Sequence, residues 1–273
     1  SGALTVWGAI LVAAIFEFAG AFFAGGHVTD TVRKGMLDIS LIGRDQLIYG
    51  MLGSLAAAGT LLVGATRFGL PVSTTHSIVG AIVGFGVVSI GPEVVNWGKI
   101  GQIVLSWLTS PLLAGVIAFG IFQFTRAKVL DTKDPVAQIR KLGPVFFFLV
   151  FFIIGLVTLF KGLKPLKLDL NLTQALIGST LLGFIGSGLG IFFIRRVQLG
   201  QEDPKDRFSR VEKIFVVLQI LTACAIAFAH GSNDVANAIG PLAAVSGAIS
   251  GAELGGKASV SPWMLAIGGI GIV

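Results

Sequence analysis

Residues 213–241 read KIFVVLQILTACAIAFAHGSNDVANAIGP, an apolar run that meets a cluster of polar side chains and then resumes. The run predicts a membrane-crossing segment, since a spanning helix needs about 20 mostly apolar residues. Lipid leaves backbone groups no partner outside the segment, so an α-helix is the expected structure. The polar cluster His230–Asp234 predicts an interruption of that helix, and polar groups inside a membrane usually serve a function.

Composition extends this interpretation to the whole chain. Of its 273 residues, 54% are hydrophobic and 12% are charged, whereas soluble domains carry about 25% charged residues. The net charge of +6 comes from basic residues in loops between apolar runs, which indicates membrane orientation rather than nucleic-acid binding. Cys224 is the single cysteine, which excludes an internal disulfide. The 38 glycines suit close packing between membrane helices.

The apolar runs predict an all-α, polytopic membrane helix bundle. Two further stretches, 72–90 and 234–249, are short and rich in glycine, and they predict broken or re-entrant helices. The expected spanning helices cover residues 4–24, 46–66, 98–125, 144–162, 172–194 and 213–229.

The basic residues predict the orientation of the bundle. The loop 126–143 holds five Lys and Arg residues and the loop 195–213 holds six, so both are expected in the cytoplasm. Two spanning helices place the loop 161–171 on the opposite face. If 72–90 is re-entrant, Arg33, Lys34 and Arg44 also lie inside, which mildly favours re-entry.

The polar stretch in the middle of the chain predicts a boundary between two halves. We divide the chain into a first transmembrane bundle (1–125), a polar cytoplasmic linker (126–143) and further transmembrane helices (144–273). Transporters are often built from two inverted repeats that share a midplane site. The last apolar run, from Trp263 to Val273, is shorter than a spanning helix, so we expect a fragment that is open at both ends.

The first candidate site is the polar cluster of residues 230–237. Asn233, Asp234 and Asn237 offer hard oxygen ligands for a cation, and Asn233 and Asn237 share a face if a helix begins here. Gly231 and Pro241 are expected to loosen the helix and to free carbonyl groups. The alternative is an ordinary helix start capped by one polar residue, but the cluster supplies five.

The second candidate site is PVSTTHS at residues 71–77, which precedes an apolar run. Pro71 disfavours helix at the preceding residue, so the helix is expected to begin within Ser73–Thr75. Free amide groups and the positive end of the helix dipole would then face an anion such as phosphate or sulfate. The alternative is a helix capped by Ser or Thr without an anion.

Several other residues are weaker candidates for chemistry. Glu17 lies inside an apolar run with no basic residue near it, and it either binds a cation or bonds to a neighbouring helix. The glycines at 186–190 resemble part of a dinucleotide loop, but they lie in an apolar run and favour helix packing. The three histidines and Cys224 lack metal-ligand spacing, so we do not expect a metal enzyme.

These segments resemble the inorganic phosphate transporter (PiT) family, whose members couple phosphate uptake to sodium or protons. Residues 231–238, GSNDVANA, are similar to the family's Gly-Ala-Asn-Asp-Val-Ala-Asn-Ala signature, with Ser232 in place of Ala. Residues 71–76 resemble its phosphate-binding helix start, and 15–17 with 31–35 resemble the adjoining helix and loop. In the family each motif occurs twice, which implies partner copies before Ser1 and after Val273.

The resemblance implies a role for each motif residue. Ser73, Thr74, Thr75 and Asn237 would bind phosphate. Asn233 and Asp234 would hold sodium with Asn237, and Glu17 would be a coupling carboxylate.

The function expected from the residues and the resemblance is symport of inorganic phosphate with sodium or protons, with no enzymatic activity and no cofactor. The protein is expected in the plasma (inner) membrane, with membrane lipid around it, in contact with no nucleic acid and able to form a homo-oligomer. Two alternatives stay open, which are a permease for sulfate or another tetrahedral oxyanion and a membrane receptor or scaffold without transport.

Overall fold

A computed structural model describes residues 3–159, 170–196, 207–251 and 260–273 of the chain. These residues are helical apart from their connections and one isolated antiparallel bridge between Leu37 and Val95. The helices are α1 (Val6–Lys34), η1 (Ile39–Leu41), α2 (Arg44–Arg67), α3 (Thr74–Ser89), η2 (Pro92–Val94), α4 (Trp97–Thr125), η3 (Arg126–Leu130, a π-helical turn), α5 (Pro135–Val157), α6 (Leu172–Arg196), α7 (Arg207–Ile249) and α8 (Pro262–Ile272).

Within the described residues, six helical stretches are long and apolar enough to cross a membrane, which agrees with the predicted number of spans. They are Val6–Gly26, Arg44–Arg67, Trp97–Leu130, Pro135–Val157, Leu172–Arg196 and Val211–Ile249. Thr74–Ser89 and Pro262–Ile272 are shorter apolar helices. At a rise of about 1.5 Å per residue, α3 is shorter than the roughly 30 Å hydrocarbon core.

The predicted linker 126–143 is mostly helical. Asp134 caps α5 by accepting a hydrogen bond from the Ala137 amide at 3.0 Å, and Pro135 occupies the first turn. Proline is favoured there because its missing amide hydrogen would have no partner within the helix. The helix therefore begins eight residues before the end of the stretch that its polarity assigned to a linker. Its role as a boundary between repeats stays a prediction.

The chain forms two compact units. Unit 1 comprises Ser1–Ala13 and Trp107–Ile226, and unit 2 comprises Ala14–Ser106 and Ala227–Val273. These limits differ from the three sequence-based divisions, because α1, α4 and α7 each contribute residues to both units.

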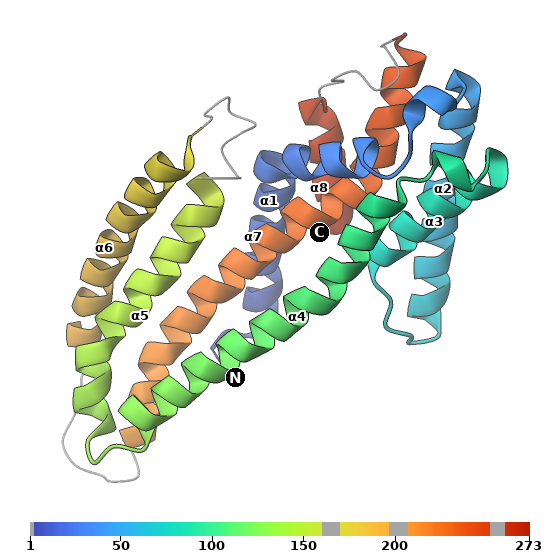
Figure 1. The fold of residues 1–273 in the computed structure, drawn as a ribbon. Coiled ribbons are helices and arrows are strands. Elements are labelled where there is room, and N and C mark those ends of the chain that lie inside the picture. Colours follow the sequence, from blue (N-terminus) through green and yellow to red (C-terminus); the bar gives the residue numbers. More distant parts are fainter. Residues whose placement is uncertain (1–2, 160–169, 197–206, 252–259) are drawn as a thin grey trace. The chain divides into compact units, whose positions relative to one another are not determined.

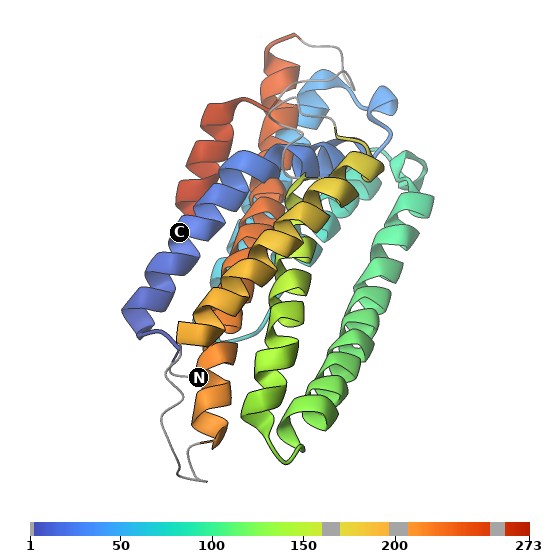
Figure 2. The same ribbon diagram turned by 90° about the vertical axis from the view of Figure 1, so that its left-hand side faces the viewer.

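Unit 1 is held together by α5 and α6, which lie side by side in Figures 1 and 2. Phenylalanines of α5 pack directly on glycines of α6, where Phe147 covers Gly190 and Phe151 covers Gly186. A side chain at either glycine would overlap the aromatic ring. The glycine-rich stretch 186–190 thus serves helix packing, as its position in an apolar run predicted.

Unit 2 contains α2 and α3, which pack side by side (Figure 1), and the crossing of α1 with α7. An ideal Cβ at Gly20 would overlap the Phe228 carbonyl, and one at Gly231 would overlap the Glu17 carbonyl. The two helix backbones therefore approach each other more closely than any side chain would allow. One buried cluster of unit 2 comprises Ala21, Val235, Ile239, Ala243, Met264 and Leu265.

Candidate functional site

The N-terminal end of α3 is formed as the sequence predicted. Ser73 is the cap residue, and its Oγ accepts a hydrogen bond from the His76 amide at 3.3 Å. Thr74 and Thr75 form the first turn, whose amide groups have no acceptor within the helix and lie at the positive end of its dipole. The capping bond uses a lone pair of Ser73, so the hydroxyl hydrogen can still be donated to an anion.

The polar cluster of α7 does not interrupt the helix, contrary to the prediction. Residues 207–249 form one helix, so neither a new helix start nor a break occurs at His230–Asp234. Gly231 does not loosen the helix, because it faces the backbone of Glu17 in α1 and permits the close crossing there. The continuous helix places His230, Asp234 and Asn237 on one face, since residues three and four apart are neighbours.

These side chains meet the start of α3 in one hydrogen-bonded network within unit 2. The Thr74 hydroxyl lies 3.1 Å from Asp234 Oδ2. Asn237 Nδ2 donates to Thr74 Oγ1 at 3.3 Å and to Thr75 Oγ1 at 3.1 Å. The structure thus brings together the two segments that the sequence marked as separate candidate sites, although about 160 positions separate them along the chain.

His230 joins Glu17 to this network. Its Nδ1 lies 3.0 Å from Glu17 Oε1, and its Nε2 lies 3.3 Å from Asp234 Oδ2. The imidazole is 53% exposed, whereas the side chains of Glu17 and Asp234 are 22% and 20% exposed. Glu17 therefore has a basic partner that its sequence neighbourhood did not show. His230 is not among the predicted site residues, although its position four residues before Asp234 indicated that the two side chains share a helix face.

Asn233 behaves differently from the other motif residues. Its side chain is exposed, and within the described part of the chain no hydrogen bond joins it to the network around Asp234. Asn237, by contrast, is buried. Pro241 lies inside α7 and has no amide hydrogen, so the Asn237 carbonyl lacks its usual helical donor. Pro241 therefore leaves this backbone oxygen beside the network without the amide that normally bonds to it.

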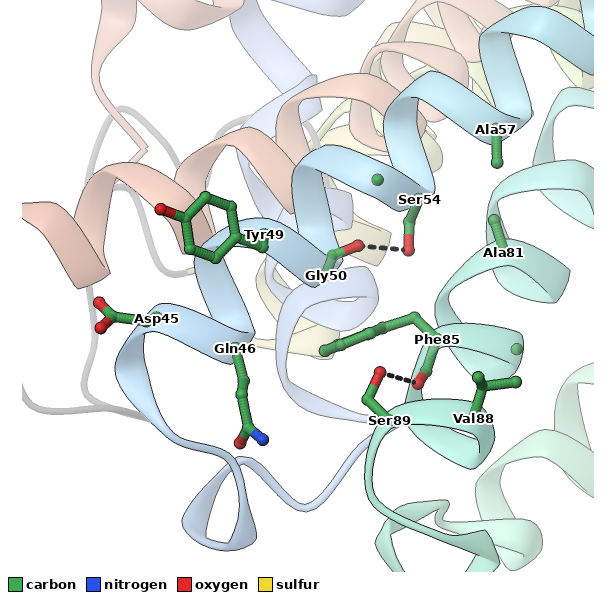
Figure 3. A pocket seen from close by; sticks show the side chains of 12 residues that line it. Asp45, Gln46, Tyr49, Gly50, Ser54, Ala57, Ala81, Phe85, Val88 and Ser89 are labelled. Carbon is green, nitrogen blue, oxygen red and sulfur yellow. Dashed lines mark hydrogen bonds between the residues drawn. The ribbon is translucent and has the colours of Figure 1, made fainter.

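A groove of about 640 Å³ lies between α2 and α3, away from this network. Figure 3 shows Ser54 and Ser89 bonded back to their own helices, at 2.8 Å to the Gly50 carbonyl and 2.7 Å to the Phe85 carbonyl. The remaining residues that line the groove are Asp45, Gln46, Tyr49, Gly53, Ala57, Ala81, Gly84 and Val88. With an acidic residue and no basic one in its lining, the groove does not suit an anion.

The network therefore combines groups for ions of opposite charge. The oxygens of Asp234 and Glu17 suit a hard cation such as sodium. The hydroxyls and free amides at the start of α3 suit an oxyanion. Thr74 of the second set bonds directly to Asp234 of the first, so that ligands of both kinds would lie close together.

Comparison with known proteins places these features in a family. The family model described as the phosphate transporter family matches residues 1–273. A protein of Haemophilus influenzae, assigned by name as a phosphate permease, is 44% identical over 275 residues, covering 100% of this chain and 66% of the relative. A chloroplastic inorganic phosphate transporter of Arabidopsis thaliana is 38% identical over 306 residues, covering 100% of this chain and 50% of that relative.

A solved structure of a protein named as the sodium-dependent phosphate transporter has the same fold. It superposes with a TM-score of 0.87 and 38% identity, over 99% of this chain and 66% of that one. The chain thus spans at most about two thirds of the length of these relatives. The six long apolar helices in the described part of the chain and this family place it among multi-pass integral membrane proteins. On its sequence and its fold, the chain belongs to the phosphate transporter family.

Proposed function

We propose that the full-length protein is a secondary active transporter that carries inorganic phosphate across the membrane together with sodium or protons. The observation that supports this most is the direct contact between the Ser/Thr-rich start of α3 and the Asp234–Asn237 face of α7. The names of the relatives support phosphate as the substrate, and the sodium dependence in the name of the structural relative supports sodium as the coupling ion.

In this proposal the two ions bind on either side of Thr74. Ser73, Thr74, Thr75 and the carboxamide of Asn237 bind phosphate with the free amides of α3. Asp234, Glu17, Asn233 and the freed carbonyl of Asn237 serve the cation, with Asn233 turning inward from its exposed position. Each ion offsets the charge of the other, which favours joint binding because uncompensated charges are costly in a medium of low dielectric.

Uptake of radiolabelled phosphate into proteoliposomes tests this function. The full-length protein should accumulate phosphate when an inward sodium or proton gradient is imposed, and the two gradients imposed separately identify the coupling ion. Asp234→Asn keeps the side-chain shape but removes the charge, so gradient-driven uptake should fall by about a hundredfold or more. Asp45→Asn, an equal loss of charge at the α2–α3 groove, should leave uptake unchanged.

Two results would count against the proposal. Undiminished uptake by the Asp234→Asn protein would refute the role of that carboxylate. Competition by sulfate as effective as that by unlabelled phosphate would favour the general oxyanion permease, because hydroxyl and amide donors do not by themselves count the protons on an anion.

A further inference from the structure

The Thr74 hydroxyl donates one hydrogen bond and accepts another, and the chemistry of its partners fixes which is which. A carboxylate can only accept, so the Thr74 hydroxyl must donate to Asp234 Oδ2 across their 3.1 Å separation. The same hydroxyl oxygen accepts from Asn237 Nδ2 at 3.3 Å. A hydroxyl has one hydrogen to donate, and that of Thr74 is therefore committed to the carboxylate.

The neighbouring hydroxyls of α3 are not committed in this way. Thr75 Oγ1 accepts from Asn237 at 3.1 Å, and Ser73 Oγ accepts from the His76 amide at 3.3 Å. Each of these bonds uses an oxygen lone pair and leaves the hydroxyl hydrogen for an anion. The start of α3 therefore offers an anion one donor fewer than its three hydroxyls could supply, and the missing donor is the one that Asp234 holds.

We propose that Thr74 couples the two ions by turning its single hydroxyl hydrogen from Asp234 to the anion when a cation binds Asp234. A cation at Asp234 Oδ2 binds the lone pair that now accepts the hydrogen bond from Thr74. Its positive charge also repels the hydroxyl hydrogen. Rotation about the Cβ–Oγ bond then points that hydrogen toward the anion. No bond to hydrogen breaks, and Asn237 continues to donate to Thr74.

This inference rests on the proposed function and adds a mechanism to it. With charge compensation alone, any nearby cation would strengthen anion binding. With the hydroxyl mechanism, the strengthening depends on Thr74. Coupling between binding sites is reciprocal, so phosphate must strengthen cation binding by the same factor by which the cation strengthens phosphate binding. Thr74 is thus a ligand for the anion whose hydroxyl hydrogen becomes available when the cation binds Asp234.

Equilibrium binding of radiolabelled phosphate to the purified full-length protein, in sodium and in choline, tests the inference. The measured quantity is the phosphate dissociation constant in choline divided by that in sodium. Thr74→Val keeps the shape of the side chain but has no hydroxyl, and its ratio should fall about tenfold below that of the wild type. Thr74→Ser restores the hydroxyl and should restore the ratio.

Thr75→Val is the matched control, because Thr75 accepts from the same Asn237 nitrogen as Thr74. This variant should bind phosphate more weakly in both media with an unchanged ratio. Sodium binding without phosphate separates coupling from disruption of the site. Thr74→Val should bind sodium at least as tightly as the wild type, since a competitor for Oδ2 is removed, whereas a disrupted site would bind it more weakly.

Failure of the inference differs from failure of the proposed function. A wild-type protein that binds no phosphate in either medium would overturn the proposed function. A wild type that binds phosphate equally in both media would overturn the inference alone. So would a Thr74→Val protein whose ratio stays within about twofold of the wild type, or one with weakened sodium binding.

Discussion

Asn237 joins the polar face of α7 to the start of α3 in the hydrogen-bonded network. Its carboxamide donates to Thr74 and to Thr75, and it is the buried member of the Asn/Asp motif. An amide can place donors toward the hydroxyls and still offer an oxygen, which an acid at the same position cannot do. In the proposed phosphate site, the two donors of this side chain occupy hydroxyl lone pairs of Thr74 and Thr75 and leave the hydroxyl hydrogens to other acceptors.

Asn237→Asp should abolish most phosphate binding. The new carboxylate would replace two donated hydrogen bonds with an acceptor and add a negative charge beside the anion. We expect the phosphate dissociation constant to rise about a hundredfold in an equilibrium binding assay. Asn96→Asp is a suitable control, since Asn96 caps the start of α4 by accepting from the Lys99 amide at 3.0 Å, which Asp does equally well. Equal affinities in the two variants would contradict the role of Asn237.

Most of the site could be predicted from residue types, but its contacts could not. Asp234, Asn237 and the threonines of α3 were identifiable because buried acids and clustered hydroxyls are costly without a function. His230 was placed in the cluster but not in the site, because its partner Glu17 lies 213 positions away. Only a contact between α1 and α7 could reveal that pairing.

At the scale of the elements, the glycines of α1 and α7 bring the carboxylate of Glu17 to the site. Gly20 faces the Phe228 carbonyl and Gly231 faces the Glu17 carbonyl, so the two helices cross with their backbones in contact. The sequence favoured a helix break at Gly231, since glycine is unfavourable in helix interiors by about 1 kcal/mol. Packing against a neighbouring helix outweighs this cost, and the helix continues.

Gly231→Ala should destabilise the protein and reduce transport. The added methyl group overlaps backbone atoms, which cannot turn aside as a side chain can. We expect a loss of about 1–3 kcal/mol in stability, the usual cost of overpacking, and a lower thermal unfolding midpoint in detergent. Gly59→Ala in α2 has no atom within 4 Å of the added group and should unfold at the same temperature or higher. A Gly231→Ala protein as stable as wild type would show that α1 and α7 do not cross so closely.

At the scale of the whole molecule, the chain is a set of apolar helices whose basic residues gather in two connections, 126–143 and 195–213. Side chains along α4 illustrate the first property, with Leu108, Leu112 and Val116 between 62% and 71% exposed. Such surfaces suit lipid or further membrane helices rather than water. The positive charge of loops 126–143 and 195–213 predicts that both lie in the cytoplasm. Residues 160–169 and 197–206 lie outside the described part of the chain.

Labelling with a membrane-impermeant maleimide tests the predicted orientation. Cys224 is the single cysteine of these 273 residues, so Cys224→Ser removes their one native thiol, and any cysteine elsewhere in the full-length protein is replaced as well. Lys133→Cys and Gly200→Cys should react only from the cytoplasmic side, because the loops that hold them carry most of the positive charge. Gly162→Cys should react only from the other side. Reaction of all three from one side would contradict the predicted topology.

The sequence by itself determined that this is a helical membrane protein, where polar side chains meet its apolar runs and which family it resembles. Composition and the length of apolar runs suffice for the first, because lipid permits few backbone structures. Only the tertiary structure decided that α7 runs unbroken through its polar cluster and that His230 links Glu17 to Asp234. It also decided that Thr74 gives its hydroxyl hydrogen to Asp234. These features depend on contacts between helices far apart in the chain, and local periodicity carries no information about such contacts.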